Sequence, residues 1–127
     1  MVMSKQGDYQ PLNDGLLEYG DLTTKRDKNT AKKIGEELTT RGRLYFGYKS
    51  IVAKYDSYLV SNLSAVDIKV QCYYVQDFQK SHKVRIKDEL FAVESVDVDN
   101  RQEYMYLFLR KVGYWDGGNY IQTSGSK

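Results

Sequence analysis

Apolar and polar residues alternate along much of the chain, which is the pattern of half-buried β-strands. In the segment VDIKVQCYY (66–74), the inward-facing positions are Val66, Ile68, Val70, Cys72 and Tyr74. Comparable segments, although with looser alternation at the first, predict further strands at 16–24, 41–49, 82–86, 89–96 and 103–112. The period of two along the chain therefore indicates five or six strands.

Turn residues and phase changes divide this pattern further. The segments 82–86 and 89–96 predict a hairpin around Lys87 and Asp88, followed by a turn at 97–102. The apolar phase slips between Val93 and Val96, which predicts a β-bulge near residues 94–95.

One segment changes its period. In 51–63 the apolar residues are spaced by three and four, which predicts a short helix whose inward face carries Val52, Tyr55, Leu59 and Leu63. Short turns, many strands and one helix predict a mainly β fold, a small antiparallel β-barrel or rolled sheet with one short helix.

The strand YMYLFLR (104–110) is apolar on both faces. One face carries Tyr104, Tyr106 and Phe108, and the other carries the aliphatic residues between them. Three aromatic side chains can bury about 450–750 Å² together, which reaches or exceeds the largest apolar patch of a typical monomer, roughly 300–600 Å². The aromatic face therefore needs a cover, either the helix or a neighbouring subunit.

Composition limits the classes of protein that fit. The chain has 127 residues, which suits one domain (16–113) between a polar N-terminal arm (1–15) and a C-terminal tail (114–127). A net charge of +2, from 19 basic and 17 acidic residues, argues against a general nucleic-acid binder. The single cysteine favours a reducing compartment, and no signal-like or membrane-spanning segment is expected. The 12 tyrosines favour strands and contact surfaces.

Few residues have the spacing that catalysis or metal binding needs. His82 is the only histidine and stands at the start of a short strand, where we expect it to be solvated. Cys72 occupies an inward strand position. Asp97 to Asn100 lacks the glycine and glutamate of a calcium loop, so a turn stabilised by Asx side chains is favoured. We expect no enzyme activity, no catalytic residue, no metal site and no cofactor.

The segment 25–37, KRDKNTAKKIGEE, is predicted to be a charged, turn-rich connection. The residues alone favour a solvated surface connection. The alternative is a basic loop that faces DNA and neutralises phosphates without reading sequence.

The segment KVRIKDELFAVESVDVDNRQEYMYLFLRKVG (83–113) has a distinctive order of elements. A short strand with Val84 and Ile86 precedes an aromatic-x-aliphatic strand with Phe91 and Val93, then an acidic turn and an aromatic/leucine strand. Together with LEYG (17–20), RGRLYFGYKSI (41–51) and Asp56, this order resembles the head–tail joining, or head-closure (stopper), proteins of long-tailed phages. The resemblance covers roughly 16–113.

The resemblance implies a structural protein of the phage neck. Family members are small β-barrels that form a ring below the portal and adaptor, close the DNA channel after packaging and dock the tail. It implies a homo-oligomeric ring of six or twelve copies, six preferred, with the portal or adaptor protein above and the tail terminator or tail tube below. Double-stranded DNA would lie in the channel, no membrane would be involved, and the ring would assemble in the host cytoplasm.

The family's channel plug is a loop between early strands, and 25–37 corresponds to it best. The candidate DNA-gating residues are Lys25, Arg26, Lys28, Asn29, Lys32, Lys33 and Gly35. In a ring the exposed aromatics would be subunit contacts, and the candidates are Tyr104, Tyr106, Phe108, Trp115 and Tyr120. The alternatives are a tail-terminator or adaptor protein of the same connector, or a β-barrel nucleic-acid-binding module.

Overall fold

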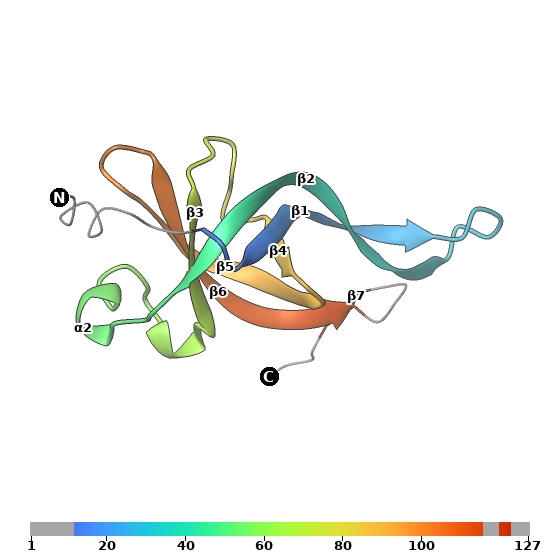
Figure 1. The fold of residues 1–127 in the computed structure, drawn as a ribbon. Helices are drawn as coiled ribbons and strands as arrows, with labels where there is room; N and C mark the ends of the chain where they lie inside the picture. Colours follow the sequence, from blue (N-terminus) through green and yellow to red (C-terminus); the bar gives the residue numbers. More distant parts are fainter. Residues whose placement is uncertain (1–11, 116–119, 123–127) are drawn as a thin grey trace.

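One antiparallel sheet rolls up on itself and forms most of the structure, a computed structural model that describes residues 12–115 and 120–122 (Figure 1). Its strands are β1 (Gly15–Arg26), β2 (Lys33–Lys49), β3 (Ile68–Tyr73), β4 (Lys83–Ile86), β5 (Glu89–Val98), β6 (Tyr104–Trp115) and β7 (Tyr120–Gln122). Their order is β3-β2-β1-β4-β5-β6-β7, and β3 also pairs with β6. This extra pairing closes six strands into a ring-like sheet, and β7 adds to β6. The predicted mainly β fold is confirmed.

The predicted hairpin and bulge are both present. β4 and β5 pair antiparallel around Lys87, which adopts a left-handed φ of 57°. The pairing of β5 with β6 shifts register between Val93 and Ser95, where the phase slip predicts it. The last predicted strand, 103–112, is longer than expected. It forms β6, which continues past Gly113 to Trp115 and pairs there with β7.

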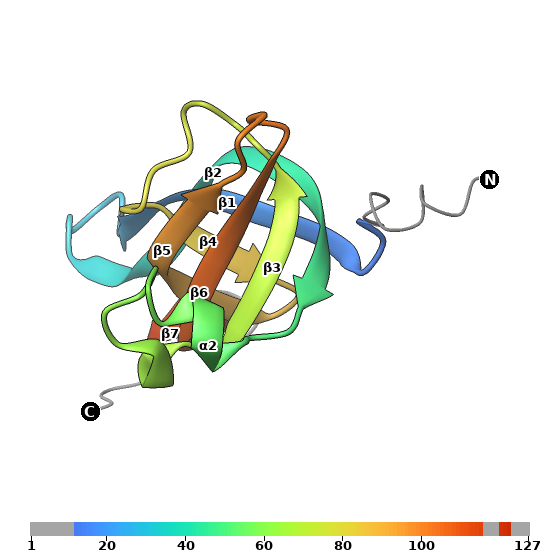
Figure 2. The ribbon, with the colours of Figure 1, turned by 90° about the vertical axis from the view of Figure 1, so that its left-hand side faces the viewer.

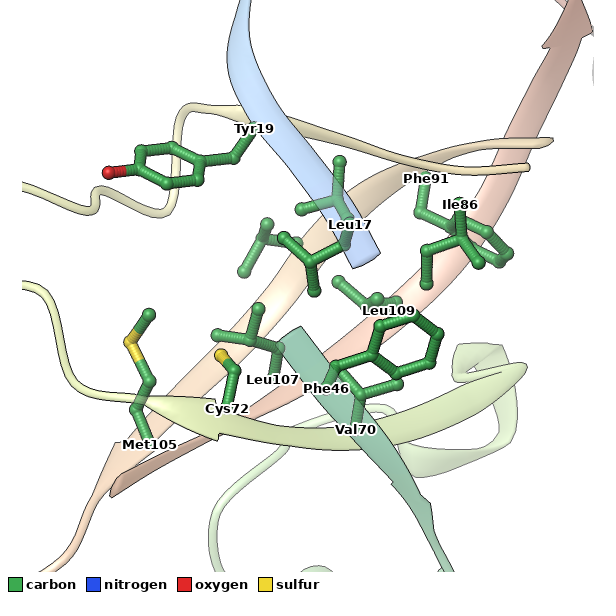
Figure 3. Close-up of a cluster of buried hydrophobic side chains, with 12 residues drawn as sticks. Leu17, Tyr19, Phe46, Val70, Cys72, Ile86, Phe91, Met105, Leu107 and Leu109 are labelled. Carbon is green, nitrogen blue, oxygen red and sulfur yellow. The ribbon is translucent and has the colours of Figure 1, made fainter. Parts of the chain in front are cut away.

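The core fills the inside of this ring. Leu17 of β1, Phe46 of β2, Val70 and Cys72 of β3 and Leu107 of β6 point toward one another (Figure 3) and are almost fully buried. Each belongs to the inward phase of its strand, so the period of two in the sequence becomes one continuous apolar interior.

The predicted charged connection at 25–37 is wrong in extent. β1 runs to Arg26 and β2 begins at Lys33, so only residues 27–32 form the turn. The reason is a tight turn, closed by a backbone hydrogen bond between Asp27 and Lys32, which lets the two strands keep pairing through the charged segment. The pairing has one register shift there, between Lys25 and Arg26.

The helix is also shorter than predicted, and its buried face is different. The segment between β2 and β3, residues 50–67, is here named the connector. It contains one helical turn, α2 (Ala53–Asp56), and a 3-10 turn, η1 (Leu63–Ala65). Asp56 and Val60 are buried, whereas the predicted inward residues Val52, Tyr55 and Leu59 are exposed. The single turn is oriented by the buried carboxylate, which overrides the apolar spacing.

The connector covers the second face of β6. Val60 and Val66 pack against Phe108, which is 0% exposed, with Leu63 and Tyr106 at the margin. Figure 2 shows the connector in front of the lower parts of β3 and β6. The cover predicted for this strand is therefore the chain's own connector at Phe108. Among the described residues, none of the helices is long and apolar enough to cross a membrane.

A bulge marks the point where β1 and β2 leave the ring. The register shifts between Tyr19 and Gly20, and Arg41 has no partner residue there. A Cβ atom on Gly20 would lie 2.0 Å from the carbonyl oxygen of Thr39. Only glycine allows the two backbones to approach this closely.

We expect Gly20→Ala to lower the free energy of unfolding by about 1–3 kcal/mol, the usual cost of a steric overlap that the backbone must relieve. Urea unfolding measures it, with Thr24→Ala on the exposed side of the same strand as the control. An unchanged midpoint for Gly20→Ala would contradict the close approach.

Candidate functional site

Strands β1 and β2 continue beyond the ring as a two-stranded ribbon. Pairing of β1 with β4 ends at Gly20, and pairing of β2 with β3 is confined to Phe46–Lys49. Between these limits the strands pair only with each other, from Asp21↔Thr39 to Arg26↔Lys33. Figure 1 shows this ribbon, residues 21–40, projecting far from the rolled sheet.

The ribbon is held by polar contacts more than by burial. The hydroxyl groups of Thr23 and Thr39 lie 3.1 Å apart across the strands. At its base, Arg41 Nε donates to Asp21 Oδ2 at 2.9 Å, and this hydrogen bond holds the pKa of Asp21 below its usual value. Isolated two-stranded hairpins are marginally stable in water, so these contacts matter for keeping the ribbon extended.

The ribbon tip is a defined turn. The carboxylate of Asp27 accepts hydrogen bonds from the backbone N–H of Asn29 at 2.7 Å and of Thr30 at 3.2 Å. The backbone N–H of Asp27 donates to the Lys32 carbonyl at 2.9 Å, and Ala31 adopts a left-handed φ of 61°. The tip therefore has a specific conformation set by one Asx side chain.

The tip gathers the candidate gating residues. Lys28, Asn29 and Lys32 are exposed in the turn, Arg26 and Lys33 are exposed opposite each other at the strand ends, and Lys25 pairs with Gly35. Within 25–33 there are five basic residues and one acid, Asp27. Behind them Lys33 Nζ lies 3.6 Å from Glu36 Oε2. The structure thus brings the predicted basic residues together at one extremity.

A buried ion pair anchors the connector to the sheet. Asp56, 4% exposed in its side chain, accepts from Lys69 Nζ at 3.1 and 3.2 Å and from the backbone N–H of Val52 at 2.8 Å. The same ammonium group lies 5.2 Å from the centre of the Phe108 ring. Ser95 Oγ adds a hydrogen bond to the Leu59 carbonyl at 2.9 Å. These contacts fix the connector over β3, β5 and β6.

The predicted subunit contacts are only partly on the surface. Tyr104 and Tyr106 are half-buried, and Phe108 is covered by its own chain, so it offers no surface to a neighbour. Arg85 stacks over the partly buried Trp115 ring, 5.7 Å from its centre. The side chain of Tyr120 lies outside the described residues.

Other aromatic residues are more exposed than the four predicted contacts whose side chains the structure describes. Tyr58 is 88% exposed, Tyr55 64%, Tyr45 63% and Tyr73 53%. For Tyr45 the signal in the sequence was its place in the outer phase of its strand, which it shares with Arg43.

His82 is buried, so the expected solvated histidine is wrong. The loop 74–82 folds back over the start of β4, and His82 Nδ1 accepts the backbone N–H of Gln79 at 3.1 Å. Its ring packs between those of Tyr19 and Phe78, with centre-to-centre distances of 5.5 and 5.6 Å. The histidine is a structural acceptor that closes this loop.

The predicted Asx-stabilised turn is present but shorter than 97–102, because Asp97 and Val98 still belong to β5 and pair with β6. The cysteine occupies the predicted inward position. Asp99 Oδ1 accepts the backbone N–H of Glu103 at 2.9 Å, which is an Asx-stabilised turn. Burial raises the pKa of the Cys72 thiol to about 12, so the thiol stays protonated and acts as a small apolar group. In the described ranges, no three His, Cys, Asp or Glu side chains are grouped so that they could hold a metal ion.

Comparisons with known proteins find similarity at the level of the fold. No protein-family model matches the sequence, and no curated protein matches it. The chain is similar to the solution structure of protein SF1141 from Shigella flexneri 2a, with a TM-score of 0.51 and 11% identity over 76% of this chain and 89% of that one. A chain from the virion of a native gene transfer agent particle aligns with a TM-score of 0.46 and 10% identity, over 90% of this chain and 100% of that chain. The first similarity shows a shared fold.

We expect Asp56→Ala to lower the free energy of unfolding by about 3 kcal/mol, the lower end of the range for breaking a buried ion pair. The change leaves the Lys69 ammonium and the Val52 N–H without their acceptor. Adding Lys69→Met should recover part of the loss, and Lys54→Met on the exposed side of the connector is the control. Denaturant unfolding measures all four proteins, and an effect of Asp56→Ala no larger than the control would contradict the anchor.

The buried thiol predicts a loss of stability at high pH. Below pH 9 the thiol is protonated in both states and has no effect. Between its ordinary pKa of 9.0 and the native value of about 12, only the unfolded state releases the proton, so the free energy of unfolding falls by up to about 1.4 kcal/mol per pH unit. Cys72→Ala should have a shallower alkaline slope than the parent in urea unfolding across this range. Equal slopes would refute the prediction.

Proposed function

We propose that this chain is a structural protein of a phage-type virion, a subunit of a neck ring that closes the DNA channel after packaging and receives the tail. The observation that carries the proposal is the ribbon 21–40 with its basic tip. The ribbon is formed by the ends of the first two strands and the turn 27–32 that joins them, where the head-closure proteins that the sequence resembles have their channel plug. The ring-like sheet with one short helical connector agrees with the small β fold of that family.

The charge distribution supports contact with DNA at the tip alone. The whole chain carries a net charge of +2, yet the segment 25–33 has five basic residues and one acid. Around a ring of identical subunits these charges repeat at one constriction, where they add to a strong positive field. Contacts of lysine and arginine with phosphates do not depend on base sequence and weaken with salt.

The ribbon makes a different kind of gate from a loose loop. The tip is closed by the Asp27 hydrogen bonds, so opening would move the ribbon as a unit. The base of the ribbon is the bulge at Gly20 and Arg41, where the pairing of β1 with β4 of the rolled sheet ends. In the proposed assembly a six-membered ring lies below the portal or adaptor and above the tail terminator or tail tube, and the function needs no catalytic group, cofactor or metal.

Replacing the ribbon tip should release packaged DNA. In one variant an Asn-Gly turn replaces residues 23–37, a sequence suited to a two-residue hairpin. In a second, glutamine replaces the five basic residues of the tip. Both should fold, because the removed side chains contribute little to the core. Heads carrying the shortened ribbon should lose DNA to added nuclease, and heads carrying the neutral tip should lose it more readily as salt is raised.

The control replaces two exposed basic residues away from the ribbon, Lys80 and Lys87, with glutamine. Heads with this variant should retain DNA like the parent. Full retention and normal tail joining by heads with the shortened ribbon would refute the gating role. If this protein were located at the end of the tail instead of in the neck, its role would be tail termination.

A further inference from the structure

The connector carries an apolar surface that its own chain leaves uncovered. We name this surface the connector patch, and its residues are Ile51, Val52, Tyr55, Tyr58 and Leu59. All five are at least 37% exposed, and they lie within nine consecutive residues. Single exposed apolar residues are ordinary, but a group of this density marks an interaction surface.

The exposure is a property of an anchored segment. Asp56 binds Lys69 and caps the Val52 N–H beneath the patch, and Ser95 Oγ holds the Leu59 carbonyl. Val60 and Phe108 fill the space below. The patch therefore faces outward because the buried pair turns it outward, and it is ordered before any partner arrives.

The exposed charge within the patch segment itself is positive. Within 50–60 the charged residues are Lys54 and Asp56, and the acid is buried in its pair with Lys69. Lys54 is exposed and lies over the Tyr55 ring, 5.6 Å from its centre. The patch thus suits an aromatic or apolar surface that carries negative charge.

The opposite end of the same molecule has these properties. We name it the turn end, and it consists of Tyr73, Asp97, Asp99, Glu103 and Tyr104. The rings of Tyr73 and Tyr104 stack with their centres 5.4 Å apart, and Tyr73 is 53% exposed. The segment 97–103 holds three acidic residues and one basic residue, Arg101. It therefore offers aromatic area together with negative charge.

The positions of the two surfaces permit head-to-tail contact. In Figures 1 and 2 the connector lies at the bottom of the molecule and the β5–β6 turn at the top. The ribbon projects sideways relative to the line that joins them (Figure 1). Copies joined top to bottom around an axis would present all their ribbons in the same way.

We propose that the connector patch of one copy docks against the turn end of the next copy. The proposal deepens the proposed function and rests on it, since it names the contact that builds the ring. The two surfaces differ, so the contact is heterologous and closes as a ring when the rotation between copies allows it. Tyr55, Tyr58 and Leu59 supply the buried aromatic and apolar area, and Lys54 faces the acids of the turn end.

Paired cysteines test the contact. Ser57→Cys and Asn100→Cys replace exposed residues that border the two surfaces without belonging to either list, and the native Cys72 is fully buried. The purified double variant, concentrated and treated with a flexible bismaleimide, should form a ladder of dimers, trimers and larger species on a denaturing gel. Each single variant should remain almost entirely monomeric. The matched control joins Ser57→Cys with Lys87→Cys, an exposed position in neither surface.

A second change separates docking from chance collision. Adding Tyr55→Ser and Leu59→Ser to the cysteine pair should reduce the ladder several-fold, and adding Thr24→Ser and Lys80→Gln should leave it unchanged. Both pairs are exposed, so circular dichroism should report the same fold for every protein.

The other outcomes overturn the proposal. A strong dimer from Ser57→Cys alone would show that the patch meets its own copy symmetrically, and a double variant that stops at dimers would show a closed pair. A double variant no more cross-linked than the control pair would mean that a different partner covers the patch. The nuclease test on filled heads is independent: a ladder with no effect of the ribbon on DNA retention would leave this contact standing and refute the neck function.

Discussion

The antiparallel pairing of β3 with β6 is the contact on which the rest of the structure depends. It closes the sheet, so the inward residues of six strands meet in one interior. It also places Lys69 directly opposite Phe108 on the outer side of the sheet. The lysine there recruits Asp56, which pins the connector over Phe108. The register of β3 against β6 therefore closes the rolled sheet, and it also sets how the connector covers β6 and how the connector patch is oriented.

Local patterns predicted most of this sheet because its strands alternate cleanly. Val70 and Cys72 face the core as their period requires, and the phase slip after Val93 locates the bulge within a residue or two. The ends of the strands were harder to predict. Charged residues at 25–37 are compatible with both a loop and a ribbon, and the choice depends on cross-strand pairs and on the Asp27 turn, neither of which has a strong local signal.

The candidate site was predictable in composition and less so in orientation. The basic residues of 25–33 do gather at one place, as expected of a short turn. The connector illustrates the opposite case. Its apolar spacing predicts that Val52, Tyr55 and Leu59 face inward, but one buried carboxylate with a lysine partner on the following strand, β3, reverses the face. Likewise His82 is buried by a loop whose path no local pattern reveals.

The bulge at Gly20 and Arg41 separates two registers within the same pair of strands. Below it, the pairing of β1 with β2 is tied to the core through Leu17 and Phe46; above it, the pairing concerns the ribbon alone. Residues inserted or removed as opposed pairs in the ribbon would therefore leave every core side chain in place. Because each strand residue adds about 3.4 Å, the reach of the tip can be changed in small steps on an unchanged scaffold.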